Sequence, residues 1–436
     1  MLRKLKSLLA IVMMLILAFS SITVLAADDD DDDETPDVPA GVIATQAAIN
    51  KTLQLPIGTE IPGATFEFLV EKISVDEVST PEALASMPEL NENNLTIAFS
   101  PADKETNTTN NITYVVKESG DIFEGVTFPH AGIFVYEITE KKDTNPPIDS
   151  NAPHEVLTYS DAKYTITVYV GYDDGGKTII KGIGTRVTVA DNGTPGDGSK
   201  VDPTPGGNGE DYIFSQMVFN NTFVKTNGAD NKENPDPTKD SESTLSVEKL
   251  VTGDFASREQ SFDFTISLEV PVLVTDVPDF YRAYIVENGT VIDPKDNVDG
   301  VAMGEDAGGK YIEISTSGET AFKLKHSQKL VFVDTPVGTG YEVTEGAATN
   351  YIPSYIVTTD NVTGSNVTGE MSTELSTGDQ LVGESVNSAN FTNNRESVTP
   401  TGLNLNDLPF IGLIALAIAS LIVFIAVKSR KRKTVD

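Results

Sequence analysis

The sequence predicts an all-β protein made of two β-sandwich domains in tandem, with a signal peptide before them and a single transmembrane helix after them. Short runs of alternating apolar and polar residues, rich in β-branched and aromatic side chains, recur between turn signals along the 436-residue chain. Such runs are typical of half-buried strands and lack a clear helical period. A long polar segment interrupts them once, which indicates two separate sandwiches.

Residues 1–27 are predicted to be a secretory signal peptide. Three basic residues among the first six precede an apolar run, and small residues then lead to Ala26 and Ala27, where we expect cleavage. Residues 28–40 begin with a block of aspartates. We expect them to form a disordered acidic leader, because like charges repel and nothing in the segment can be buried.

Residues 41–224 are predicted to form the first sandwich. Asp173-Asp174-Gly175-Gly176 has the composition of a hairpin turn. The segment 192–210 is rich in Gly, Pro and Asp and is expected to be a loop. One short helix is expected over 82–87. The expected strands lie at 65–70, 132–138, 164–170, 178–180 and 217–219.

Residues 225–243 are predicted to link the two sandwiches, because Asn, Asp, Glu, Pro and Lys dominate them. Residues 244–396 are predicted to form the second sandwich. Its expected strands lie at 245–247, 262–268, 321–324, 330–333, 341–344 and 389–391.

Residues 397–436 form a three-part C-terminal segment. The first part contains Thr399-Pro400-Thr401-Gly402, and the second is an uncharged apolar run over 408–427. About twenty residues of helix, rising about 1.5 Å each, can cross a hydrocarbon core of about 30 Å. The basic residues that follow from Lys428 are expected on the cytoplasmic side. An ordinary single-pass anchor with a chance Pro-Thr-Gly is the alternative interpretation.

The composition argues against several functional classes. A formal net charge of −34 disfavours nucleic acid as a partner, because binding it requires clustered Lys and Arg. The chain has no cysteine and only three histidines, whereas zinc sites and Ser/His triads depend on these residues. A His-Glu-x-x-His, Gly-x-Ser-x-Gly or P-loop motif is also absent from the sequence. We therefore expect no metal, no cofactor and no enzymatic activity.

Both predicted sandwiches contain the same ordered set of motifs. Each begins with a lysine on its first strand, continues with an aromatic-acid-aromatic run and a Tyr-Glu-x-Thr-Glu motif, and closes with Phe-x-Asn. Residues two apart on a strand share a face, so the closing asparagine lies on the same face as its apolar phenylalanine. The set is Lys51, Phe66-Glu67-Phe68, Tyr136–Glu140 and Phe219–Asn221, and then Lys249, Phe262-Asp263-Phe264, Tyr341–Glu345 and Phe391–Asn393.

A reaction between lysine and asparagine, assisted by glutamate, would explain why these polar residues lie on an apolar face. Burying such groups unpaired costs several kcal/mol. A buried lysine loses its proton readily, and the neutral amine can attack an asparagine carbonyl carbon. A buried glutamic acid with a raised pKa can bond that carbonyl and shuttle protons. Ammonia leaves and a side-chain amide forms; by analogy with disulfides, it would stabilise each domain by roughly 5 kcal/mol.

With these motifs, the chain from about Ile43 to Gly402 resembles the streptococcal-type backbone pilins, which have immunoglobulin-like (CnaB-like) domains with intramolecular isopeptide bonds. The resemblance is stronger in the second unit, for example in its Val-Glu-Lys-Leu-Val-Thr-Gly opening and its Phe-Thr-Asn close. It implies two crosslinks, each promoted by a glutamate: Lys51 with Asn221 beside Glu140, and Lys249 with Asn393 beside Glu345.

Three other residues stay open as alternatives for these roles. Lys72 also lies on a plausible strand of the first unit. Asn220 and Asn394 are adjacent to the implied asparagines, but their parity places them on the opposite face of the strand from Phe219 and Phe391.

The C-terminal segment resembles a Gram-positive cell-wall sorting signal, with Pro400, Thr401 and Gly402 as its motif. The resemblance implies that a sortase cuts between Thr401 and Gly402 and transfers the Thr carbonyl to an amine. In a pilus this amine belongs to a lysine of the next subunit. Lys200 is the candidate in this chain, and Lys225 is the fallback.

These resemblances imply a structural protein that is secreted, anchored to the cell wall and assembled into a pilus from a membrane-tethered precursor. The expected partners are sortase, identical subunits and a peptidoglycan precursor, and a host surface ligand is a further candidate. One alternative is a wall-anchored adhesin that does not polymerise. Another is a wall-bound hydrolase, which would need a concave site with convergent carboxylates.

Overall fold

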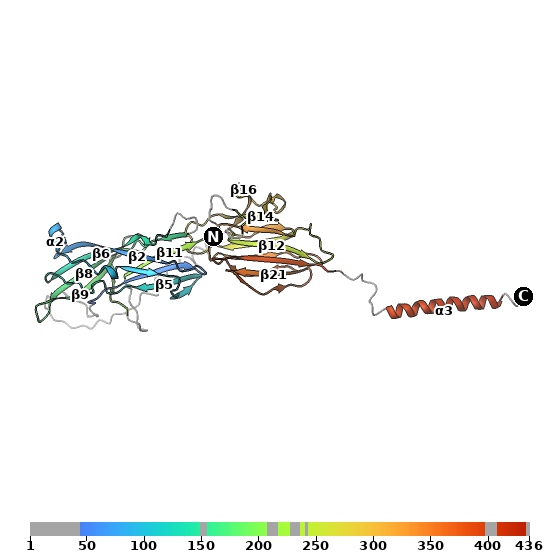
Figure 1. Ribbon diagram of the computed structural model, residues 1–436, viewed down its shortest axis with the longest axis horizontal. Helices are drawn as coiled ribbons and strands as arrows, with labels where there is room; N and C mark the ends of the chain where they lie inside the picture. Colours follow the sequence, from blue (N-terminus) through green and yellow to red (C-terminus); the bar gives the residue numbers. More distant parts are fainter. Residues whose placement is uncertain are drawn as a thin grey trace, which may run out of the picture.

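The computed structural model describes residues 44–148, 155–206, 217–226, 236–239, 243–396 and 408–432. Within these residues the chain forms two β-sandwiches that lie end to end and one C-terminal helix that stands apart from both (Figure 1). The predicted signal peptide, the acidic leader and the Thr-Pro-Thr-Gly motif lie outside the described residues.

The first sandwich contains a five-stranded sheet in the order β4-β5-β1-β11-β7 and a six-stranded sheet in the order β10-β9-β8-β6-β2-β3. Alternation of buried and less buried residues, as along β8, gives each sheet one apolar face. The strands are β1 (Ile49–Pro56), β2 (Ala64–Val75), β3 (Thr96–Phe99), β4 (Asn107–Thr109), β5 (Ile112–Glu118), β6 (Gly132–Asn145), β7 (Glu155–Thr158), β8 (Lys163–Tyr172), β9 (Thr178–Val189), β10 (Lys200–Val201) and β11 (Met217–Lys225), with helices α2 (Pro81–Ser86) and η1 (Glu92–Asn94) between β2 and β3.

The second sandwich contains a ten-stranded sheet, whose main path is β16-β17-β14-β19-β12-β26-β21-β22, and a five-stranded sheet with the main path β18-β13-β20-β24. Strands β15, β23 and β25 pair with β14, β21 and β20. The elements are β12 (Leu245–Thr252), β13 (Phe262–Glu269), β14 (Phe280–Glu287), β15 (Thr290–Val291), η3 (Pro294–Asp296), β16 (Met303–Asp306), β17 (Gly309–Ser315), β18 (Thr320–Leu324), β19 (Gln328–Phe332), β20 (Gly340–Glu345), β21 (Ile352–Thr359), β22 (Val362–Thr363), β23 (Val367–Thr368), β24 (Leu375–Ser376), β25 (Gln380–Leu381) and β26 (Ser388–Asn394).

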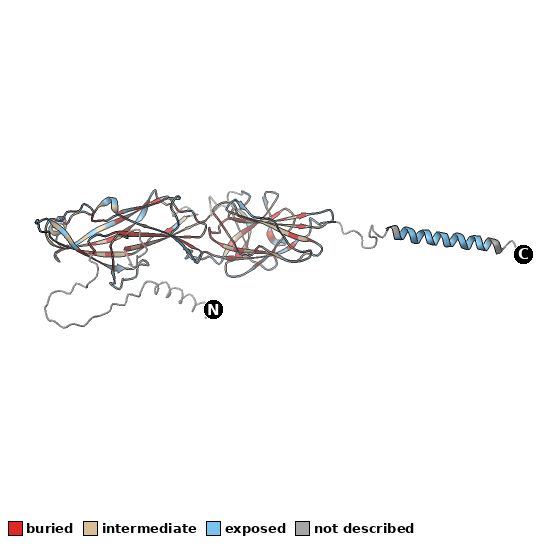
Figure 2. Ribbon diagram, turned by 90° about the horizontal axis from the view of Figure 1, so that it is seen from below, coloured by how far each residue is buried: buried red, intermediate tan, exposed pale blue. Residues whose placement is uncertain are grey.

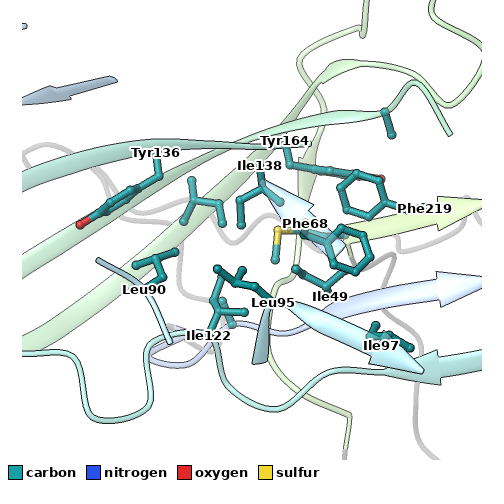
Figure 3. Close-up of a cluster of buried hydrophobic side chains, with 14 of the residues drawn as sticks. Ile49, Phe68, Leu90, Leu95, Ile97, Ile122, Tyr136, Ile138, Tyr164 and Phe219 are labelled. Atoms are coloured by element: carbon teal, nitrogen blue, oxygen red, sulfur yellow. The ribbon is translucent and has the colours of Figure 1, made fainter. Parts of the chain in front are cut away.

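Apolar side chains from both sheets of each sandwich fill its interior. Buried residues run along the middle of both domains, whereas residues 410–429 of the C-terminal helix are exposed (Figure 2). In the first domain Phe219 of β11 packs against Phe68 of β2, with ring centroids 4.9 Å apart, and against Tyr164 of β8 (Figure 3). Aromatic pairs of this kind join the two sheets.

The first and last strands of each domain are parallel neighbours. Strand β1 pairs with β11, and Lys51 is opposite Phe219. Strand β12 pairs with β26, and Lys249 is opposite Phe391. The register is therefore the same in both domains, and it places each lysine two residues away from an asparagine on the partner strand.

The two sandwiches meet at a junction that β11 enters directly. Lys225, the first residue of the predicted linker, is the last residue of β11, and its carbonyl accepts a hydrogen bond from Val337 N at 2.8 Å. Glu384 of the second domain accepts from Glu60 N at 2.6 Å and from Lys225 Nζ at 2.7 Å. The segment predicted as a loop over 192–210 also contains a short strand, β10, because Lys200 and Val201 pair with β9.

The C-terminal helix α3 (Leu408–Arg432) contains a stretch, Phe410–Ser429, that is long and apolar enough to cross a membrane. It includes most of the predicted transmembrane residues. Its mean hydropathy is 3.0 and none of it is buried against the sandwiches. Apolar side chains around the full circumference of a helix are typical of a membrane span.

The junction leads to a first prediction, for Gly338→Ala. Gly338 has a φ of +81°, and an added Cβ would lie 2.7 Å from Pro56 Cβ. The substitution should cost about 1–3 kcal/mol of stability, from backbone strain and the clash across the junction. Thermal unfolding of residues 28–401 would measure the loss.

Gly378→Ala is the matched control, because Gly378 has a φ of +62° but no atom within 4 Å of the added Cβ. Its cost should come from the backbone conformation alone. An equal fall in melting temperature for both variants would contradict a close contact at Gly338.

Candidate functional site

The first candidate site lies between the sheets of the first domain, where β1, β6 and β11 bring three polar side chains together. Lys51 Nζ is 2.8 Å from Glu140 Oε1, and both side chains are fully buried. Asn221 Nδ2 donates a hydrogen bond to the same Oε1 at 3.0 Å. One carboxylate oxygen therefore contacts both the amine and the amide nitrogen.

Apolar residues surround this polar group. Lys51 Nζ lies over the ring of Phe66 at 4.9 Å from its centroid and donates to the backbone carbonyl of Phe219 at 3.1 Å. The ring of Phe219 packs on Phe68. These contacts exclude water, so the ion pair lies in a low-dielectric interior, where charge is expensive and hydrogen bonds are strong.

The second candidate site repeats this geometry in the second domain. Lys249 Nζ is 2.6 Å from Glu345 Oε1, and both side chains are fully buried. Asn393 Nδ2 donates to Glu345 Oε1 at 2.8 Å. Lys249 Nζ lies over the ring of Phe262 at 4.5 Å from its centroid. Two domains that share motifs in the sequence thus share a site in three dimensions.

Burial controls the ionisation of both pairs. Desolvation lowers the pKa of Lys51 to about 8, although Glu140 opposes the shift. It lowers the pKa of Lys249 to about 8 as well, against the attraction of Glu345. Desolvation also raises the pKa of Glu140 and of Glu345, despite the nearby lysine in each case. Both shifts move the pair towards a neutral amine and a neutral carboxylic acid.

The contact of the carboxylate differs from the expectation. Sequence reasoning placed the glutamic acid on the asparagine carbonyl, but in both domains the carboxylate accepts from the amide nitrogen instead. The carbonyl oxygens have different surroundings. Asn221 Oδ1 accepts from the backbone N–H of Ser160 at 2.7 Å. Asn393 Oδ1 is buried and has no hydrogen-bond partner among the described residues.

The alternative residues lie outside these sites. Lys72 is on β2 but is partly exposed, where its Nζ contacts Glu89 and donates to Met87 O at 2.8 Å. Asn220 and Asn394 are half-buried, whereas Asn221 and Asn393 are buried. The alternation of the last strands, which parity predicted, explains this difference.

The two candidate acceptor lysines have different environments. Lys200 is exposed on β10, where it pairs with Arg186 of β9. Lys225 forms an ion pair with Glu384 at the domain junction, at 2.7 Å and with both side chains half-buried. Pro400, Thr401 and Gly402 lie outside the described residues.

Sequence reasoning did not single out Ser160 and Asp191, which complete the first site. Ser160 N–H also donates to Glu140 Oε2 at 3.1 Å, and Ser160 Oγ donates to Asp191 Oδ1. Both residues lie in loops without a counterpart in the repeated motifs. Among the described residues, no group of three or more His, Cys, Asp or Glu side chains is placed to hold a metal ion.

Comparison with known proteins agrees with this architecture. Residues 47–224 match the family of Spy0128-like isopeptide containing domains, and residues 243–395 match a domain of unknown function (DUF7601). A pilin of Streptococcus pyogenes serotype M1 is 22% identical over 309 residues, which cover 70% of this chain and 71% of the relative.

Solved structures include two major pilins of Streptococcus pyogenes among those similar to the chain. The first is 18% identical with a TM-score of 0.31, and covers 81% of this chain and 100% of its own. The second, the T3.2 pilin, is 19% identical with a TM-score of 0.29 and the same coverage.

The first sandwich belongs to the family of Spy0128-like isopeptide containing domains, and the second is a β-sandwich that matches a domain of unknown function. The chain as a whole is similar to a streptococcal pilin.

The ionisation of the first site leads to a second prediction, for Asn221→Ala. This variant keeps Lys51 and Glu140 but cannot form an amide between residues 51 and 221. Folded Lys51 loses its proton near pH 8, whereas the unfolded lysine keeps it up to about 10.5. The unfolded state therefore binds more protons in this window, and the stability of the first domain should rise with pH between these values.

The rise should be on the order of 3 kcal/mol at most, because each pKa unit corresponds to about 1.4 kcal/mol. Urea denaturation followed by circular dichroism, from pH 7.5 to 10.5, would measure it. The control is Lys51→Met/Asn221→Ala, which lacks the titrating amine. The same pH slope in both variants would rule out a buried lysine with a lowered pKa.

Proposed function

We propose that the protein is a sortase-polymerised, wall-anchored pilus subunit in which each domain is closed by an autocatalytic Lys–Asn isopeptide bond. The observation that carries the proposal is the repeated buried triad: an amine, a carboxylate and an amide in contact, in the same register in both domains. The proposed crosslinks are Lys51–Asn221 and Lys249–Asn393.

The first step is proton transfer inside the buried pair. The proton of Lys51 Nζ moves to Glu140, which leaves a neutral amine and a neutral carboxylic acid. The opposing pKa shifts of the two groups favour this transfer. The amine then attacks Asn221 Cγ, and the carbonyl π electrons move to Oδ1 to give a tetrahedral intermediate.

The second step is loss of ammonia. Glu140 is in contact with Asn221 Nδ2 and gives its proton to that nitrogen, so the Cγ–Nδ2 bond breaks and NH₃ leaves. The oxyanion returns its electrons to re-form the carbonyl, and Nζ, now bonded to Cγ, gives its extra proton back to Glu140. The carboxyl group ends neutral, and one amide has formed for each ammonia released. The same steps apply to Lys249, Glu345 and Asn393.

Polymerisation and anchoring are proposed to use the C-terminal segment. A sortase breaks the Thr401–Gly402 peptide bond, which frees the amine of Gly402, and transfers the Thr401 acyl group to a lysine of the next subunit. Exposure favours Lys200 as that acceptor. Lys225 fits the role less well, because its amine is held by Glu384 at the junction. The apolar helix would hold the precursor in the membrane until cleavage.

Mass spectrometry tests the crosslinks in a third prediction. The folded secreted chain should weigh less than its sequence by two ammonia losses, roughly 17 Da each, because each amide releases one NH₃. Lys51→Ala or Glu140→Ala should remove one loss, and Lys249→Ala or Glu345→Ala the other. Lys72→Ala is the control and should keep both losses. An unshifted wild-type mass would falsify the proposed bonds.

Gel electrophoresis tests polymerisation in a fourth prediction. Cells that express the chain with its sortase should show a ladder of high-mass species on boiled SDS gels, since each junction is a covalent amide. Lys200→Ala should abolish the ladder, whereas Lys177→Ala, which removes an exposed lysine from the β8–β9 turn, should leave it intact. A ladder that survives Lys200→Ala would assign the acceptor elsewhere, and no wild-type ladder would favour the adhesin alternative.

A further inference from the structure

The crosslinking chemistry generates negative charge on one atom. Among the described residues, the first domain supplies a hydrogen-bond donor to that atom and the second domain does not. Attack on an amide carbonyl converts its oxygen to an oxyanion, and donors already aimed at that atom are among the largest contributions to catalysis of acyl transfer. Ser160 N–H lies 2.7 Å from Asn221 Oδ1. Ser160 N–H therefore already donates to the oxygen that would carry the negative charge.

Glu140 does not bind the oxyanion, because its carboxylate contacts the leaving nitrogen, Asn221 Nδ2. Its Oε1 contacts Lys51 Nζ and accepts from Asn221 Nδ2, and its Oε2 accepts from Ser160 N. The carboxyl group is thus placed to move protons between the two nitrogens. Stabilising the oxygen of the tetrahedral intermediate requires a different group.

Ser160 is held in place by a carboxylate outside the buried triad. Ser160 Oγ donates to Asp191 Oδ1. Asp191 Oδ1 also accepts from Asn220 N at 3.1 Å. Ser160 Oγ also accepts from Ala162 N at 3.1 Å. Asp191 therefore ties the loop that carries Ser160 to the strand residue next to the reacting asparagine.

We propose that the Ser160 backbone N–H is the oxyanion-binding group of first-domain crosslinking, and that Asp191 is the positioning residue that aims it. This inference rests on the isopeptide chemistry proposed above. The second domain reacts without such a donor, since Asn393 Oδ1 and Glu345 Oε2 have no hydrogen-bond partner among the described residues. The rate of the second-domain crosslink can therefore serve as an internal reference in the same chain.

The test measures the rate of each crosslink in the full chain. The chain is made by cell-free translation in detergent with a pulse of isotope-labelled lysine, and samples are quenched in acidic guanidinium. Proteolysis and mass spectrometry then quantify the peptide pairs 51–221 and 249–393. Asp191→Ala should slow the first crosslink relative to the second by about tenfold or more, since loss of one oxyanion donor costs about 10²–10³ in rate.

Two further variants separate positioning from charge and from folding. Asp191→Asn keeps an oxygen that can accept from Ser160 Oγ and should restore the rate to within about threefold, although it removes the charge. Ser160→Ala keeps the backbone N–H but deletes the hydroxyl that Asp191 holds, and should slow the first crosslink as Asp191→Ala does. Melting temperatures in an Asn221→Ala background report what each variant does to the fold alone.

The outcomes distinguish this inference from the proposed function. If Asp191→Ala and Ser160→Ala crosslink the first domain as fast as wild type, Ser160 is not held by Asp191 for this reaction. If Asp191→Asn is as slow as Asp191→Ala, the charge of Asp191 acts rather than its hydrogen bond, and the positioning role is wrong. If the wild-type chain forms neither crosslink, the isopeptide proposal itself fails.

Discussion

Parallel pairing of the first and last strands is the constraint on which both sites depend. In each domain the two strands lie side by side in one sheet, with a lysine opposite a phenylalanine and an asparagine two residues further on. Because side chains two apart share a face, this register directs the amine and the amide into the same interior. A slip of one residue would turn the asparagine to the outer face and leave the buried lysine without its partner.

The cost of burying an ion pair favours a reaction that removes its charges. Removing both charges of Lys51 and Glu140 from water costs several kcal/mol per ion, which their mutual contact and the surrounding hydrogen bonds must offset. Formation of the amide between residues 51 and 221 would therefore also stabilise the fold, because the amide is neutral and needs no counter-ion. The burial that makes the pair costly, with Lys51 Nζ over the ring of Phe66, also lowers the pKa of the amine.

Much of the strand arrangement and of the two sites could be predicted from the sequence, because both depend on local residue patterns. The alternation along β6, β8 and β26 reveals their buried faces, and the repeated motifs pair Lys51 with Asn221. Strands that lack alternation were missed. Strand β14 is buried on consecutive residues, and β21 contains Pro353. Ser160 and Asp191 could not be found, since a loop reveals its backbone hydrogen bonds only when the chain is folded.

The strand arrangement also determines how tension would pass through a subunit. Pulling on the chain after β26 and before β12 acts along two parallel neighbours and tends to slide them. A bond from Lys249 to Asn393 would block that sliding and leave most of the second sandwich outside the path of the force. At the junction the path enters β11 through Lys225, whose ion pair with Glu384 joins the domains. If the acceptor is Lys200, it lies inside the loop closed by residues 51 and 221. The force would then reach Lys200 through the chain between residues 200 and 221. A bond from Lys51 to Asn221 would provide a second covalent route in parallel.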